Sequence, residues 1–251
     1  MGQDGKRFIC KGIIGLVMLL AWIPQTIESG EKFKKRTVLI LTGGHDFDRD
    51  AFFRMFKSFG NVSYEERVHP LSEIAYTSEW CKRFDAVVFY DMHQEISTEQ
   101  KSAFRRMANR GMGLVFLHHS LASYQNWPDF EKIIGGKYLL EAENRGGVTV
   151  PGSLYRHDVE MRVRIADPRH AVTQGLEEFT LQDEIYGGYL TQPGIHPLIT
   201  TDHAESVPVI GWTHRYGKAR IVYLQPGHDH HAFEHPSYRQ LVRQAIEWVS
   251  R

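Results

Sequence analysis

Four short, largely apolar runs that each lead into a histidine constrain the fold of this chain more than any other feature of its sequence. Runs of four or five apolar residues are typical of strands buried on both faces of a parallel sheet. In an open α/β sheet, ligands bind outside the carboxyl ends of the strands, so polar residues placed there face a common crevice. The runs and their histidines are Val38–Thr42 with His45, Ala86–Tyr90 with His93, Leu114–Leu117 with His118 and His119, and Ile221–Leu224 with His228.

The order of the expected elements predicts the architecture. Between residues 38 and 117 it is strand, helix, strand, strand, helix, strand, which is typical of a doubly wound, flavodoxin-like sheet in which most strands are parallel. Further along, Val159, Met161 and Val163 alternate with charged residues, which indicates a half-exposed strand. We therefore expect an α/β fold in which residues 137–215 form an antiparallel extension with long loops. No repeat or linker interrupts residues 31–251, which predicts a single domain.

Charge gives little reason to expect nucleic acid or an anionic membrane as a partner. Lys and Arg together number 30, as do Asp and Glu, so no net field would attract either one. Histidine, by contrast, occurs 14 times in 251 residues. Because imidazole titrates near neutrality and binds metals, this abundance is in keeping with a polar site that carries chemistry.

The first thirty residues differ from the rest of the chain. Lys6, Arg7 and Lys11 precede an apolar run at residues 13–23, which Pro24 ends. A basic start before a short apolar run is typical of a secretory signal, and the run is shorter than the roughly 20 residues that span a bilayer. We expect residues 1–30 to be a signal peptide and the protein to be periplasmic or secreted, without a stable membrane partner after cleavage. The alternative is an uncleaved membrane anchor.

Several polar residues near the strand ends are candidates for the site. His45 follows the glycine pair Gly43–Gly44, and glycine allows a backbone to approach a ligand closely. Neighbouring residues point in different directions, so only one of His118 and His119 need enter the crevice, and the other would be structural. Next to His228, the run Asp229–His231 has the composition of a metal-binding tract, although a solvated loop is the usual explanation.

A pair of acids, Asp183 and Glu184, precedes a segment rich in Gly and Tyr that has little helical or strand pattern. We expect this segment to be a loop that folds over the sheet edge, where a carboxylate beside histidines would serve as a general base or a metal ligand. Aromatic residues could supply flat faces for a sugar ring, with core packing as the alternative. These aromatic residues are Tyr155, Tyr186, Tyr189 and Trp212.

The chain resembles the ThuA family, named for trehalose utilisation, whose fold is similar to that of class I glutamine amidotransferases. The resemblance rests on an ordered set of stretches that covers nearly all of residues 31–251. They are TGGHDF (42–47), GLVFLHHS (113–120), NWPDFEKIIGG (126–136), DPRHAVTQGL (167–176), DEIYGG (183–188), WTHRYGKARIVYLQPGHD (212–229) and the terminal helix to Trp248.

The resemblance implies which residues form the site and what they act on. The family's associations imply work on keto-sugars derived from disaccharides or glycosides, beside a sugar dehydrogenase that makes them. The catalytic positions implied are His45, His118, Asp183, Glu184 and His228, while His170 and Arg220 also match and could be structural. To substrate binding we assign Gly44, Asp46, His119, Tyr186, Trp212 and Asp229.

The sequence departs from the amidotransferase pattern at the strand-to-helix elbow. That chemistry needs a cysteine thiolate there with a histidine to activate it. The elbow of this chain instead carries His118, His119 and Ser120, and Cys81 precedes a different strand. Glutamine hydrolysis is therefore excluded, and Ser120 is a weak candidate nucleophile because its flanks are not G-x-S-x-G.

The reaction that best fits these residues is proton transfer on a carbonyl sugar. A ketone acidifies the neighbouring C–H, so one base and one electrophile suffice for enolisation, followed by isomerisation or elimination. The base would be Glu184 or a neutral histidine. The electrophile would be a protonated histidine or a divalent metal such as zinc, held by His45, His118 and His228.

Two other functions remain open. One is a metal-dependent hydrolase of glycosides, and the other is a carbohydrate-binding protein without catalysis. Association into a homo-oligomer also stays open. All enzymatic versions require His45, His118, Glu184 and His228 to line one pocket at the carboxyl edge of the sheet.

Overall fold

The computed structural model describes residues 1–2, 34–71 and 76–250. By its contacts the chain divides into residues Met1–Phe33 and a compact unit, Lys34–Arg251. The fold below is that of the compact unit. The predicted signal peptide and its apolar run lie, except for the first two residues, outside the described residues. Within the described part of the chain, no helix is long and apolar enough to cross a membrane.

The compact unit is built on a nine-stranded sheet in the order β2-β1-β3-β4-β13-β12-β11-β8-β9. Strands β2 to β13 of this order are parallel and the remaining strands are antiparallel, so the predicted α/β fold with an antiparallel extension is confirmed. The parallel strands are β1 (Arg36–Gly43), β2 (Val62–Val68), β3 (Ala86–Asp91), β4 (Gly113–Leu117) and β13 (Ala219–Leu224). The antiparallel strands are β12 (Val209–Tyr216), β11 (His196–Thr200), β8 (Leu154–Ile165) and β9 (Phe179–Gly187).

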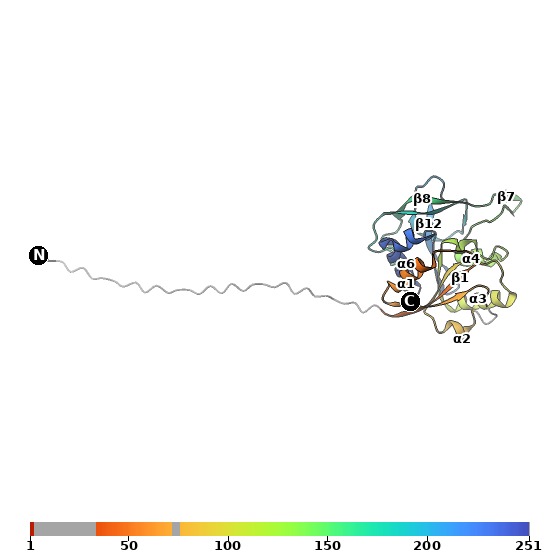
Figure 1. Cartoon of the computed structure of the whole chain (residues 1–251), viewed down its shortest axis with the longest axis horizontal. Coiled ribbons are helices and arrows are strands. Elements are labelled where there is room, and N and C mark those ends of the chain that lie inside the picture. Colours follow the sequence, from red (N-terminus) through yellow and green to blue (C-terminus); the bar gives the residue numbers. More distant parts are fainter. Residues whose placement is uncertain (3–33, 72–75, 251) are drawn as a thin grey trace. The chain divides into compact units, whose positions relative to one another are not determined.

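Helices cover both faces of the parallel part of the sheet (Figure 1). On one face lie α1 (Arg49–Lys57), α5 (His230–Glu234) and α6 (Pro236–Val249). On the other lie α2 (Ser78–Cys81), α3 (Thr98–Arg110) and α4 (Pro128–Ile134), while a 3-10 helix, η1 (His118–Ala122), follows β4. Two small ribbons complete the described unit, β5 (Gly136–Lys137) with β10 (Leu190–Thr191) and β6 (Glu143–Arg145) with β7 (Val148–Val150).

The central strands are apolar on both faces because each face is covered. Val38 and Ile40 of β1 pack into the core with α1 and α6, whereas Leu39 and Leu41 pack into the core with α3. Successive side chains of a strand point to opposite faces, so a strand between two helical layers needs apolar residues at every position. This burial fixes the carboxyl ends of β1, β3, β4 and β13 at one edge.

The acidic pair lies in a strand and not in the predicted loop. Asp183 and Glu184 belong to β9, which pairs with β8 through Val159 opposite Asp183. The sequence does not reveal this strand, because both acids are buried, at 3% and 5% exposure. Polar residues therefore occupy buried positions, and the segment lacks the apolar–polar alternation that marks a half-exposed strand. The end of this ribbon lies against the loop after β13, where the Gln225 side-chain amide donates to the Glu184 carbonyl at 2.7 Å.

Candidate functional site

His118 stands at the end of β4 in a left-handed backbone conformation, with φ of 50°. Such a conformation is costly for a residue with a side chain and is often found where function requires it. Its Nδ1 lies 2.7 Å from the carbonyl oxygen of Gln225. Because a carbonyl only accepts hydrogen bonds, Nδ1 carries a hydrogen and donates it. The other ring nitrogen, Nε2, faces Glu184 and His228.

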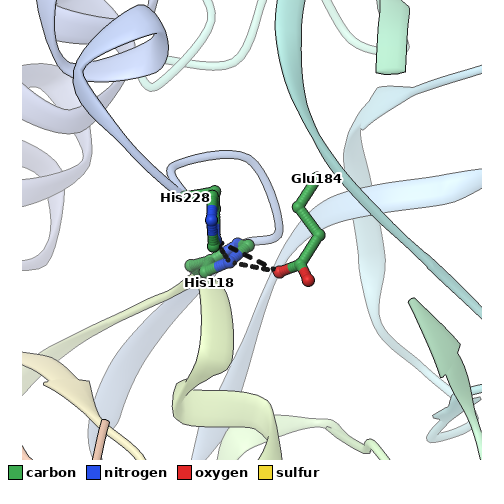
Figure 2. Close-up of side chains that lie close together, drawn as sticks. All are labelled: His118, Glu184 and His228. Carbon is green, nitrogen blue, oxygen red and sulfur yellow. Dashed lines mark hydrogen bonds and ion pairs between the residues drawn. The ribbon is translucent and has the colours of Figure 1, made fainter. Parts of the chain in front are cut away.

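Three side chains from different segments meet at this point (Figure 2). The His118 Nε2 lies 2.8 Å from Oε2 of Glu184. The Nδ1 of His228, from the loop after β13, lies 3.3 Å from the same His118 nitrogen and 3.4 Å from the same Glu184 oxygen. One ligand atom from each residue thus lies within 4.8 Å of the other two. We call His118, Glu184 and His228 the central cluster.

Asp183 holds the loop that carries His228. Its carboxylate accepts hydrogen bonds from the backbone N–H groups of Gly227 at 2.8 Å and His228 at 3.0 Å. Adjacent residues of a strand point to opposite sides, so Asp183 faces this loop while Glu184 faces the histidines. Gly227 has φ of 123°, and a Cβ there would lie 2.2 Å from the Tyr238 hydroxyl. The placement of Asp183 is that of a positioning residue, in contrast to the catalytic role predicted for it.

Within the central cluster, neighbouring charges and hydrogen bonds shift the pKa values of Glu184 and His228. Burial works to raise the pKa of Glu184, but hydrogen bonds and charges from His118 and His228 outweigh it and hold that pKa well below its usual range. The hydrogen bond to Glu184 raises the pKa of His228 in turn, against the effect of burial. Glu184 is therefore a carboxylate that attracts positive charge and is a weak proton acceptor by itself.

A cavity of about 230 Å³ lies beside Glu184. Its lining residues are His45, Met92, His119, Ala122, Tyr138, Leu140, Tyr155, His157, Glu184 and Tyr186. Tyr186 joins this wall to the cluster, since its hydroxyl lies 3.0 Å from the His118 Nε2 and its ring stacks on the imidazole at 4.9 Å. The predicted site residue Tyr186 thus lies against the cluster, and Tyr155, which is 61% exposed, lies at the solvent side.

His157 is a site residue that the sequence reasoning missed. Its Nδ1 lies 3.4 Å from Oε1 of Glu184, and its ring centre lies 4.6 Å from that of His228. The β8–β9 register shifts here, since Arg156 pairs with Ile185 and Val159 pairs with Asp183, so two residues of β8 face Glu184. Such a bulge turns a side chain out of the regular alternation. The only sequence signal is that the polar–apolar alternation begins at Val159, after His157.

His45 and His119 form a separate pair on the cavity wall. Their rings stack with centres 4.7 Å apart. Burial, followed by the charges of His118 and His45, lowers the pKa of His119 well below its usual value, so this ring is neutral. Both His118 and His119 are thus buried at the site, whereas one of them was expected to be structural. The predicted metal ligand set His45, His118 and His228 needs a correction, because Glu184 and not His45 completes the group of ligand atoms.

Four other predicted substrate contacts lie in different positions. Trp212 is fully buried and its indole nitrogen donates to the Ile134 carbonyl at 2.9 Å, so it is a core residue and that assignment is wrong. Gly44 has φ of 81°, and a Cβ there would lie 2.6 Å from the Met92 backbone, so it packs the loop that carries His45. Asp46 lines a neighbouring cavity of about 640 Å³, and Asp229 is the N-cap of α5.

Cys81 lies in another part of the described structure. It lines a cavity of about 540 Å³ together with Asp85 and Arg110, at the other end of β3. Burial raises the pKa of this thiol to about 11, so it is protonated near neutral pH. A buried, protonated thiol is a poor nucleophile, and Cys81 is absent from the cavity that Glu184 lines.

Solved structures with the same fold include two ThuA-like proteins. One, from Parabacteroides merdae, is 18% identical with a TM-score of 0.71 over 86% of this chain and 90% of that one. The other, from Bacteroides uniformis, is 18% identical with a TM-score of 0.63 over 87% and 92%. A β-galactosidase from Bacillus circulans sp. alkalophilus aligns over 84% of this chain but 30% of its own, at 9% identity and a TM-score of 0.55. These likenesses show the class I glutamine amidotransferase-like fold.

The family comparison covers most of the sequence. No curated protein matches the chain. The model of the ThuA family, described as trehalose utilisation, matches residues 37–249. That range includes every residue of the central cluster and of the cavity wall. The chain therefore belongs to the ThuA family.

Proposed function

We propose that the protein is a carbohydrate-active enzyme that moves a proton at a carbon next to the ketone of a keto-sugar or a 3-keto-glycoside. The observation that carries the proposal is the convergence of His118, Glu184 and His228 beside a cavity lined with tyrosines. A ketone polarises the neighbouring C–H, and the enediolate that forms needs a positive group at its oxygen. Trehalose utilisation, the family description, is consistent with a sugar substrate.

The geometry suggests how the roles are divided. His157 is the proposed base, because it is half-exposed and its Nδ1 faces Glu184 at 3.4 Å, which leaves Nε2 for the substrate. A carboxylate that orients an imidazole in this way is a common arrangement in acid–base catalysis. The central cluster is the proposed electrophile, since the Glu184 carboxylate lies 2.8 Å from His118 and 3.4 Å from His228 and raises the pKa of His228. Expulsion of the substituent at the adjoining carbon, or reprotonation, then gives elimination or isomerisation.

The tyrosines fit a sugar at this place. Tyr138 and Tyr155 line the cavity together with Tyr186, and aromatic faces pack against the C–H faces of sugar rings while hydroxyls bond to sugar oxygens. A hydrolase of unoxidised glycosides is the second candidate. It is favoured by the same three converging ligand atoms, since a metal held there would activate water.

Purified protein incubated with 3-keto-glycosides and with their unoxidised parents tests the proposal. We expect turnover of the oxidised substrates alone. His157→Ala should lower turnover by about 100-fold, as expected for loss of a general base. Arg156→Ala is the matched control, because Arg156 is the neighbouring residue and pairs with Glu205 outside the cavity. Turnover of unoxidised glycosides would favour the hydrolase, and binding without any turnover would favour a carbohydrate-binding protein.

Export is part of the proposal. We propose that residues 1–30 are removed as a signal peptide and that the enzyme works in the periplasm or outside the cell, on a product of a sugar dehydrogenase of the same route.

A further inference from the structure

We propose that the central cluster binds one divalent metal ion of the zinc type, through Nε2 of His118, Nδ1 of His228 and Oε2 of Glu184. This inference concerns the site of the proposed function, but metal binding is measured apart from turnover. The first argument is the set of contacts that the two ring nitrogens of His118 make. The Nδ1 hydrogen of His118 is committed to the Gln225 carbonyl at 2.7 Å. Its Nε2 lone pair therefore faces a carboxylate oxygen at 2.8 Å and a second imidazole nitrogen at 3.3 Å. The Tyr186 hydroxyl also lies 3.0 Å from this Nε2, but the carboxylate oxygen at 2.8 Å places negative charge beside the two imidazole nitrogens, which favours a cation among the three atoms.

The second argument is the spacing of the three atoms. Zinc bonds of about 2.0–2.1 Å at the tetrahedral angle place ligand atoms roughly 3.3 Å apart. The His228 Nδ1 lies 3.3 Å from His118 Nε2 and 3.4 Å from Glu184 Oε2, which matches that separation. These two distances are long for hydrogen bonds. The 2.8 Å contact between His118 and Glu184 is a hydrogen-bond distance, and a small movement of either side chain would lengthen it to the separation of two metal ligands.

The third argument is the support around the ligands. Histidines that bind metals usually donate their second ring N–H to a carbonyl or carboxylate, as His118 does to Gln225. The other carboxylate oxygen of Glu184, Oε1, lies 3.4 Å from Nδ1 of His157, whereas Oε2 is the oxygen that faces both ligand nitrogens, which favours binding through Oε2. Asp183 fixes the loop of His228 through two backbone N–H groups. Two histidines and one glutamate are a ligand set typical of catalytic zinc sites, which keep a further position for water or substrate.

A second group of ligand atoms, at Asp229, His230 and His231, lacks this support. Two of its members are exposed, and the Asp229 carboxylate already accepts the N–H of His231 as the cap of α5. We assign no site to it. It is nevertheless able to contribute weak metal binding in an assay, and this determines the design of the test.

Calorimetry with Zn²⁺ and visible absorption with Co²⁺, on untagged full-length protein carrying His230→Ala and His231→Ala, test the proposal. We expect one metal ion per chain and a cobalt spectrum typical of tetrahedral coordination. Adding His228→Ala should weaken binding by at least about 100-fold, more than the 10–100-fold typical of supporting residues. His228 is partly exposed, so this variant should fold, and circular dichroism checks that it does. The His157→Ala change should weaken binding less, by about 10-fold.

The two proposals fail in different ways. Unchanged zinc affinity in the His228→Ala and His118→Ala proteins, or binding lost with the His230 and His231 changes alone, would overturn the metal site. Failure to bind zinc at all would also overturn the metal site, and keto-sugar turnover by that same protein would leave the proposed function standing, with protons as the electrophile. Tight binding at the central cluster without turnover of any keto-sugar would support the metal site and refute the function.

Discussion

At the scale of single residues, the rule that strand ends meet at one edge predicted from the sequence alone that His118 and His228 lie together, and their ring nitrogens are 3.3 Å apart. It could not find His157, because a bulge and not a strand end directs that ring to Glu184. It also could not separate Asp183 from Glu184, since the two acids are adjacent and only the pleat of β9 sends them to opposite sides. Trp212 was assigned to substrate binding because the sequence does not distinguish a strand aromatic residue that faces a ligand from one that faces the core.

Asp183→Ala should destabilise the protein by about 1–3 kcal/mol, because it leaves the buried N–H groups of Gly227 and His228 without an acceptor. It should also lower turnover, since His228 would lose its fixed position. Thermal denaturation and kcat measure the two effects. Asp202→Ala is the control, because Asp202 forms an exposed ion pair with Arg164. Equal stability of the two variants would contradict the positioning role of Asp183.

A buried acid outside the site predicts a pH effect on stability. Burial raises the pKa of Asp91 to about 7, and burial, with the charge of His93 second, lowers the pKa of its neighbour His69 to about 3. His69 is thus neutral and supplies no compensating charge. Native Asp91 holds its proton more tightly than the unfolded chain does, so its contribution to stability is fully present below pH about 4 and is lost as pH rises to about 7.

Asp91→Asn removes this titration. The stability of the variant relative to the wild type should therefore rise by roughly 4 kcal/mol between pH about 4 and about 7, and stay level above that. Urea denaturation across this range measures the difference. A difference between the two proteins that does not change with pH would show that Asp91 is ionised throughout.

At the scale of helices and strands, the sequence predicted the elements whose ends and periodicity are set by residues close together in the chain. The capping box of Ser97 and Gln100 starts α3 and Gly111 ends it in a left-handed conformation, so both ends of this helix are set by residues within it or next to it. The last helix, α6, opens with Pro236, and the His235 side chain caps it by accepting a hydrogen bond from the Ser237 N–H. Strand β9 was missed because its burial depends on contacts with the loop after β13, which no short window of sequence contains.

The bulge of β8 makes its own prediction. Asp158 has φ of 56°, a left-handed conformation that Asp tolerates better than β-branched residues do. Asp158→Val should cost about 1–3 kcal/mol and lower turnover by shifting His157. Asp158→Gly is the matched control and should keep both stability and activity. Full activity and stability of the valine variant would mean that the bulge does not position His157.

At the scale of the whole molecule, the parallel core follows from the apolar runs, because strands buried on both faces need helices on both sides. The crossing of the β8–β9 ribbon to the loop of Gln225 could not be predicted, since it depends on pairing between distant segments.

The predicted export concerns residues 1–30. N-terminal sequencing of protein from the periplasm or the medium should find a start near residue 31, and an intact Met1 there would contradict cleavage.

Hydrogen exchange at the substrate tests the central claim most directly. In D₂O, the enzyme should place deuterium on the carbon next to the ketone of a 3-keto-glycoside, and proton NMR follows the loss of that signal. Glu184→Gln keeps the shape of the side chain but removes the charge that His118 and His157 face, so it should slow exchange by about 100-fold while circular dichroism stays unchanged. Exchange as fast with the variant as with the wild type, or none above the uncatalysed rate with the wild type, would contradict the account.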